Sequence, residues 1–114
     1  MRVMVIPVDG TQATYTMELE GNTLKAMQEL VGGYIECAPL VELRARGIEL
    51  IVNEEGLLAQ LPPNENLFPF FLVGTAVAVG IGEEDFVSLT PEQVKFLERW
   101  LFRLKTFDSY HGHP

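Results

Sequence analysis

The first part of the chain holds two segments whose apolar residues follow the spacing of β-strands. Residues 3–8 are rich in β-branched side chains and stop at Asp9-Gly10, a pair typical of hairpin turns. In residues 13–19, apolar and polar side chains alternate, which is typical of a half-buried strand. We therefore expect the two segments to pair as antiparallel strands.

The spacing changes from strand to helix after Gly21. Apolar side chains recur every three or four positions from Leu24 to Val31. Asn22 can cap the start of this helix, because its side-chain oxygen accepts a hydrogen bond from a free helix N–H. Gly32-Gly33 provides a C-terminal stop. The pattern therefore predicts a short helix over residues 23–31 with one buried stripe.

Two more strands are expected in the middle of the chain, over residues 34–40 and 47–53. Residues 41–46 between them are compatible with a helical turn or with an irregular link. Residues 64–74 are also left open, because 64–67 can start a short helix that Pro69 would limit.

The last part of the chain predicts two strands and a long helix. Residues 75–81 are continuously apolar, as in a strand buried on both faces, and 86–89 form a short returning strand. Thr90, Pro91 and Gln93 then form a helix start, with a cap and its reciprocal partner. We expect the helix to end at about Lys105, followed by a flexible tail over residues 106–114.

The order of these elements predicts one α+β domain over residues 1–105. Its sheet would be mixed or mostly antiparallel, with five to six strands. We expect the short helix and the C-terminal amphipathic helix to cover one face of the sheet.

Composition and charge narrow the class of protein. The 114 residues contain 8 Lys and Arg against 16 Asp and Glu, a formal net charge of −8. Direct nucleic-acid binding is not expected, because Lys and Arg drive that binding by displacing counterions, and an anionic membrane would repel the chain. The single cysteine, Cys37, excludes an intrachain disulfide and fits a reducing compartment. We expect a soluble, intracellular protein that does not enter membranes.

Several turn residues could form a ligand site if their loops meet. Glycines allow a close approach to the backbone, a tyrosine offers a stacking face, and Asn and Glu side chains offer hydrogen bonds. The simpler interpretation is a helix stop and turn-stabilising amides. The candidate residues are Gly32, Gly33, Tyr34, Glu36, Asn53, Glu54 and Asn64.

Other chemistry-bearing residues have simple structural explanations. The acidic runs 54–55 and 83–85 fall in predicted turns and lack the spacing of a calcium loop, which favours solvated turns over catalysis. His111 and His113 lie in the predicted tail, and Cys37 in a predicted strand favours inert core packing. We therefore expect no catalytic residues, no metal site and no cofactor.

The C-terminal helix carries more aromatic residues than one buried stripe needs. The surplus predicts a second contact, either with a partner protein or with the aromatic segment at 68–71 of the same chain. The candidate interaction residues are Phe68, Phe70, Phe71, Phe96, Trp100 and Phe107.

Four segments occur in an order that resembles the domain-of-unknown-function 3846 family, small proteins of phages, plasmids and bacteria. They are VIPVDG at 5–10, LVGGYIE at 30–36, VNEEG at 52–56 and LPPN at 61–64. The resemblance covers residues 1 to about 104 and implies a mobile-element context, but no reaction. The aromatic stretch at 68–71 and the end of the chain beyond Lys105 depart from the pattern.

We expect a non-enzymatic accessory protein that binds a host protein through its aromatic surface. The alternative is a protein that binds or sequesters a small ligand such as a nucleotide. Against that alternative, the sequence has no clustered phosphate clamp, since Arg2, Lys25, Arg44 and Arg46 are scattered or lie on the 41–46 link. A homodimer is a further expectation for the aromatic surface.

Overall fold

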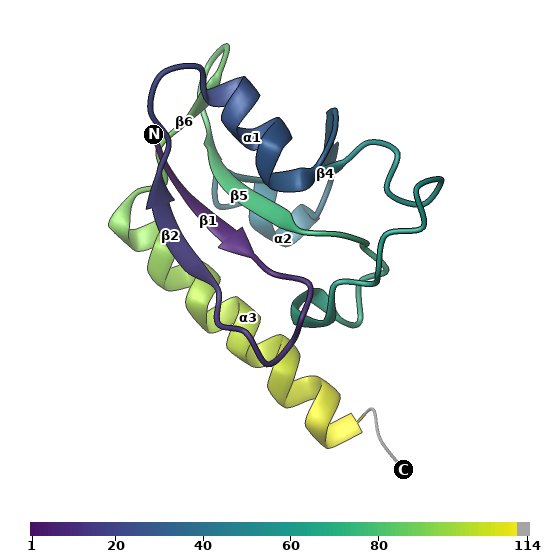
Figure 1. Cartoon of the computed structure of the whole chain (residues 1–114). Coiled ribbons are helices and arrows are strands. Elements are labelled where there is room, and N and C mark those ends of the chain that lie inside the picture. Colours follow the sequence, from purple (N-terminus) through teal and green to yellow (C-terminus); the bar gives the residue numbers. More distant parts are fainter. Residues whose placement is uncertain (112–114) are drawn as a thin grey trace.

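A six-stranded antiparallel sheet lies at the centre of the computed structural model, which describes the backbone of residues 1–111 and the side chains of residues 1–106 (Figure 1). The strand order is β2-β1-β5-β4-β3, and β6 pairs with the last two residues of β5. The predicted α+β class and the single domain are confirmed. In chain order the elements are β1 (Arg2–Ile6), β2 (Tyr15–Glu18), α1 (Thr23–Val31), β3 (Ile35–Ala38), α2 (Val41–Arg44), β4 (Ile48–Asn53), the 3-10 helix η1 (Glu65–Leu67), β5 (Ala76–Ile81), β6 (Phe86–Val87) and α3 (Pro91–His111).

The central strand β5 is buried on both faces, as its continuous apolar sequence predicts. It pairs antiparallel with β1 on one side, where Val5 faces Val77, and with β4 on the other, where Ile51 faces Val77. The first two strands also pair as expected, with Val3 opposite Met17. These pairings place the ends of β1 and β4 and the start of β5 at one end of the sheet, which we call the loop end.

Helices cover both faces of the sheet, so the expectation of cover on one face is wrong. Met27 and Val31 of α1 pack with Val77 and Val79, whereas Leu97 and Trp100 of α3 pack on the opposite face with the alternate residues of the same strands. The physical reason is the sequence of β1, β4 and β5, whose successive side chains point to opposite faces and are apolar on both.

The predicted helix signals are confirmed. The Asn22 side chain accepts from Lys25 N at 3.1 Å, and Gly32 closes α1 in the left-handed conformation at φ 82°. At the start of α3, Thr90 and Gln93 exchange hydrogen bonds of 2.9 and 3.1 Å. The two open segments contain short helices, α2 within 41–46 and η1 within 64–74.

Helix α3 is longer than the sequence analysis predicts, because it continues past Lys105 to His111. No Gly or Pro interrupts residues 92–111, and the Thr106 hydroxyl bonds back to Phe102 O at 3.0 Å. In Figure 1 the end of α3 extends past the sheet. Residues 106–111 therefore belong to the helix, and residues 112–114 lie outside the described residues.

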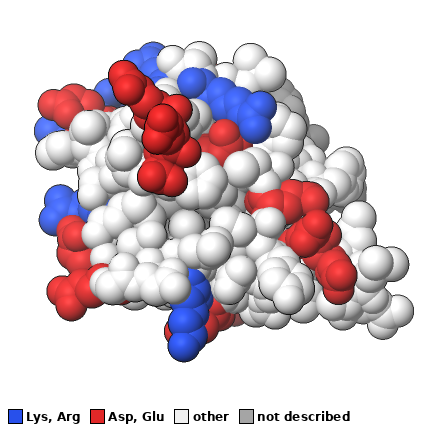
Figure 2. Space-filling view, turned by 90° about the horizontal axis from the view of Figure 1, so that it is seen from above, with Lys and Arg blue, Asp and Glu red and all other residues white. Residues whose placement is uncertain are grey.

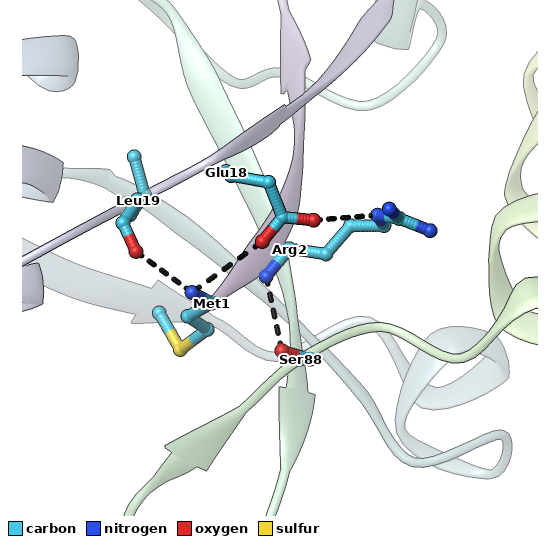
Figure 3. Close-up of polar contacts among 5 residues, drawn as sticks. All are labelled: Met1, Arg2, Glu18, Leu19 and Ser88. Carbon is cyan, nitrogen blue, oxygen red and sulfur yellow. Dashed lines mark hydrogen bonds and ion pairs between the residues drawn. The ribbon is translucent and has the colours of Figure 1, made fainter.

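Polar contacts hold Met1 and Arg2 against β2 and the segment after β6 (Figure 3). The Met1 ammonium donates to Leu19 O at 2.7 Å and lies 3.6 Å from Glu18 Oε2. Arg2 Nε donates to Glu18 Oε1 at 2.8 Å, and Arg2 N donates to Ser88 Oγ at 3.0 Å. The Met1 ammonium and the Arg2 guanidinium therefore both contribute to holding β2 in the sheet.

None of the helices in the described part of the chain is both long and apolar enough to cross a membrane.

Candidate functional site

Part of the predicted glycine site, the loops of Gly33, Tyr34 and Asn53, comes together at the loop end, but its polar groups bind the chain's own backbone. Asn64 instead contacts Ile6, Gly74 and Asn66. Asn53 Nδ2 donates to Val31 O at 3.1 Å, and Asn53 Oδ1 accepts from Glu55 N at 2.8 Å. Gly33 lies so close that a Cβ there would be 2.9 Å from Asn53 Nδ2. Tyr34 O accepts from Glu54 N at 2.8 Å. The glycines therefore let Asn53 approach and fasten the end of α1.

Asn64 has the same kind of role in the interior. It is 2% exposed, and its Nδ2 donates to Ile6 O at 3.0 Å and to Gly74 O at 2.9 Å. Its Oδ1 accepts from Asn66 N at 3.0 Å. The polar atoms of this buried amide are occupied by backbone partners, so they stabilise the fold and are not free to bind a ligand.

Of the acidic candidates, Glu36 and Glu54 have exposed side chains. The run at 83–85 forms the turn between β5 and β6, which a bond from Gly82 N to Asp85 O closes at 2.9 Å. In the part of the chain that the structure describes, His, Cys, Asp and Glu side chains form no group of three or more that could hold a metal ion. The side chains of His111 and His113 lie outside the described residues.

Figure 2 shows a face of the molecule on which acidic side chains form separate groups, with uncharged surface between them. The negative charge is therefore not gathered into one continuous patch on this face. This distribution agrees with the even spread of acidic residues along the sequence.

Cys37 is exposed, so the expectation of core packing is wrong. It lies in β3, an edge strand that pairs only with β4 among the described strands, and an edge leaves a side chain open to solvent. Desolvation of the thiol, followed by the charge of Glu49, raises the pKa of Cys37. The neighbouring Glu49 carboxylate, 7% exposed, is held by Arg44 Nη2 at 2.9 Å. A raised pKa keeps the thiol protonated and poorly reactive at neutral pH.

The aromatic candidates divide into buried and exposed residues. Trp100 is 2% exposed, its ring stacks on Phe70 at 5.7 Å, and its Nε1 donates to Glu42 Oε2 at 2.7 Å. Trp100 is therefore a core residue and is not available to a partner, because the segment at 68–71 packs over it. Phe96 is partly buried beneath Arg46, whose guanidinium carbon lies 4.5 Å from the ring centroid. The Phe107 side chain lies outside the described residues.

The segment at 68–71 lines an open apolar groove of about 520 Å³ at the loop end. Leu67 is fully buried and anchors the segment, and bonds from Phe70 N to Leu67 O and from Leu72 N to Phe70 O, both 2.9 Å, fix its bend. This bend leaves Phe71 94% exposed. The residues that line this apolar groove are Leu57, Pro63, Asn64, Glu65, Phe68, Phe70, Phe71, Leu72 and Val73.

Sequence reasoning misses part of this groove, and of a second one it names only Phe96 as a candidate. Leu57 follows the acidic turn at 54–55 and is 80% exposed, and only the fold brings it near Phe71. A second groove of about 600 Å³, the arginine groove, lies along α3 and the turn after α2, and it brings Arg46 together with Arg99 and Arg103, which lie far from Arg46 in the sequence. It is lined by Arg46, Phe96, Glu98, Arg99, Phe102 and Arg103.

Comparison with known families identifies the domain. A family model described as a domain of unknown function, DUF3846, matches residues 1–102 of the 114-residue chain. The chain belongs to the DUF3846 family. The match spans all six strands of the described fold and the first half of α3. Searches of curated proteins and of solved structures find no match.

The four segments on which the resemblance rests meet at the loop end of this DUF3846 domain. Asn64, from LPPN at 61–64, bonds Ile6 O, from VIPVDG at 5–10. Asn53, from VNEEG at 52–56, bonds Val31 O, from LVGGYIE at 30–36. These residues therefore build the end of the sheet beside which the apolar groove lies.

Proposed function

We propose that this DUF3846 domain is a non-enzymatic accessory protein of phage or mobile-element type that binds a protein of its bacterial host. The apolar groove is the contact surface. The observation that carries the proposal is the exposure of Phe71 and Leu57, 94% and 80%, at the rim of a groove lined by further apolar side chains. Exposed apolar patches with polar rims are typical of protein-binding sites.

The groove has the composition of an interface that binds by burial. Burying one large apolar side chain such as Phe71 contributes about 1.5–3 kcal/mol. Phe68 and Phe70 are 42% and 37% exposed, so they add partly available aromatic surface beside it. Aromatic residues dominate the energetics of protein interfaces, and a partner side chain seated here would touch several of them.

Charge indicates the chemistry of the partner. Glu65 lines the groove, and Glu54 and Glu55 precede Leu57 in the same loop. With a net charge of −8, the whole chain also attracts basic surfaces. The segment that fits is therefore apolar at its centre, with Lys or Arg on its flanks.

Binding of a small ligand at the predicted glycine site is less well supported. Both polar atoms of the Asn53 amide, and the buried Asn64 amide, already bind backbone groups. A ligand there would have to replace those bonds, which hold the end of the sheet.

The test is capture from host lysate with wild-type protein and two variants, Phe71→Ser in the groove and Leu24→Ser on α1. Leu24 is half-exposed and lies on the opposite face of the sheet from α3, so it is a matched loss of apolar surface. We expect one host protein to be retained by wild type and by Leu24→Ser and to be lost by Phe71→Ser. Retention should also weaken as salt is raised.

Two outcomes would overturn the proposal. One is a protein retained equally by all three forms, which would place its contact elsewhere. The other is a homodimer that dissociates on Phe71→Ser, since a second copy would then occupy the groove. Sedimentation of the purified protein distinguishes the two.

A further inference from the structure

The arginine groove gathers positive charge on a chain that is otherwise acidic. Three of the 8 Lys and Arg residues, Arg46, Arg99 and Arg103, line it together with Phe96 and Phe102. Residues 96, 99 and 103 share one side of α3, because positions three and four apart are neighbours on a helix. Phe102 borders them and is 70% exposed.

The fold holds Arg46 against this helix from a distant part of the chain. Gln93 Nε2 donates to Arg46 O at 2.9 Å and to Gly47 O at 3.1 Å, which fastens the turn before β4 to the start of α3. Gly47 allows this turn because it adopts a positive φ of 72°. The Arg46 guanidinium then rests over the ring of Phe96. Contacts between the turn before β4 and helix α3 therefore hold Arg46 beside the arginines of α3.

The arginines have little countercharge within the described side chains. Among residues 1–106, neither Arg46 nor Arg99 forms an ion pair, and Arg103 reaches only Glu42, at 4.0 Å between two largely exposed side chains. Among residues 1–106, Glu98 is the one carboxylate that lines the groove. Arg99 and Arg103 are four positions apart on α3, where like charges disfavour each other, so a bound anion would relieve this repulsion.

We propose that the arginine groove binds a mononucleotide that carries two or more phosphates. Guanidinium groups bind phosphate oxygens in a bidentate manner, and three arginines line this groove. The exposed ring of Phe102 offers a face on which a base can stack. The volume of about 600 Å³ is that of a small-molecule site. A nucleic-acid polymer fits less well, because the net charge of −8 would repel the rest of its backbone.

This site is separate from the apolar groove, so the proposal stands or falls independently of host-protein binding. No phosphate clamp is visible in the sequence, because Arg46 lies far along the chain from Arg99 and Arg103. The structure assembles those three side chains around one groove.

The test is an NMR titration of the ¹⁵N-labelled full chain with ADP, adenosine and pyrophosphate. We expect ADP to shift the amide signals of residues 46–47 and 96–103. Adenosine or pyrophosphate alone should bind about tenfold more weakly than ADP, since each makes only half of the contacts.

Variants then test the residues. Arg99→Gln and Phe102→Ser should each weaken ADP binding about tenfold, whereas Lys25→Gln, which removes one charge from α1, should change it less than about twofold. Three results would overturn the proposal. They are no shifts with about 5 mM ADP, equal affinities for ADP and pyrophosphate, and equal weakening by Arg99→Gln and Lys25→Gln.

Discussion

Replacing Asn64 by alanine removes three hydrogen bonds from the buried centre of the loop end. The side chain is 2% exposed, so water cannot replace it at Ile6 O, Gly74 O or Asn66 N. Each bond contributes about 0.5–1.5 kcal/mol, and groups left buried without a partner cost more. We expect Asn64→Ala to lower the free energy of unfolding by about 2–4 kcal/mol, a large share of the about 5–15 kcal/mol typical of a domain.

The assay is equilibrium unfolding in urea, followed by the fluorescence of the single tryptophan. Trp100 is buried and stacked on Phe70, so its emission reports loss of packing on the α3 face. Asn53→Ala is the matched control, because Asn53 makes two such bonds from a partly exposed site, and it should cost about 1–2 kcal/mol. A smaller loss for Asn64→Ala than for Asn53→Ala would refute the structural role assigned to Asn64.

Two further predictions concern Cys37 and the start of α3. Desolvation and, after it, the charge of the Glu49 carboxylate raise the pKa of the Cys37 thiol. Glu49→Gln removes the second cause, so it should move the reactivity–pH curve of Cys37 towards lower pH, measured with a thiol reagent. Glu36→Gln should move it less, because Glu36 is the smaller cause of the raised pKa, and equal shifts would contradict this order. Thr90→Ala should lower the free energy of unfolding by about 1 kcal/mol through loss of the bond to Gln93 N, with Thr90→Ser nearly neutral in the same urea titration.

Local signals in the sequence are strong enough to predict most elements. The Asn22 cap, the Gly32 stop and the Thr90–Gln93 pair each act within a few residues, and all three form as predicted. The end of α3 is missed, because no breaker marks it before Gly112. The arrangement of helices on the sheet is harder to predict than the helices and strands themselves. That helices cover both faces of the sheet follows only when the apolar residues of three strands are considered together.

The candidate sites are less predictable, because they depend on contacts between distant residues. Asn53 and Asn64 look alike as turn amides or ligand groups in the sequence, and only their backbone partners distinguish the two roles. The sequence pattern around Trp100 is the same whether the side chain is buried or exposed. In the structure it is buried, because the Phe70 ring stacks on it. The arginine groove needs the bond from Gln93 to Arg46 O, which no local pattern indicates.

The most direct test of the proposed function is a calorimetric titration of the captured host protein, once purified, into wild type, Phe71→Ser and Leu24→Ser. Phe71 is almost fully exposed, so Phe71→Ser should leave the fold intact while it removes the largest free apolar surface of the groove. Loss of about 1.5–3 kcal/mol corresponds to about 10- to 150-fold weaker binding. We expect this weakening for Phe71→Ser, with Leu24→Ser equal to wild type. Equal affinities for all three proteins would show that the apolar groove is not the contact surface.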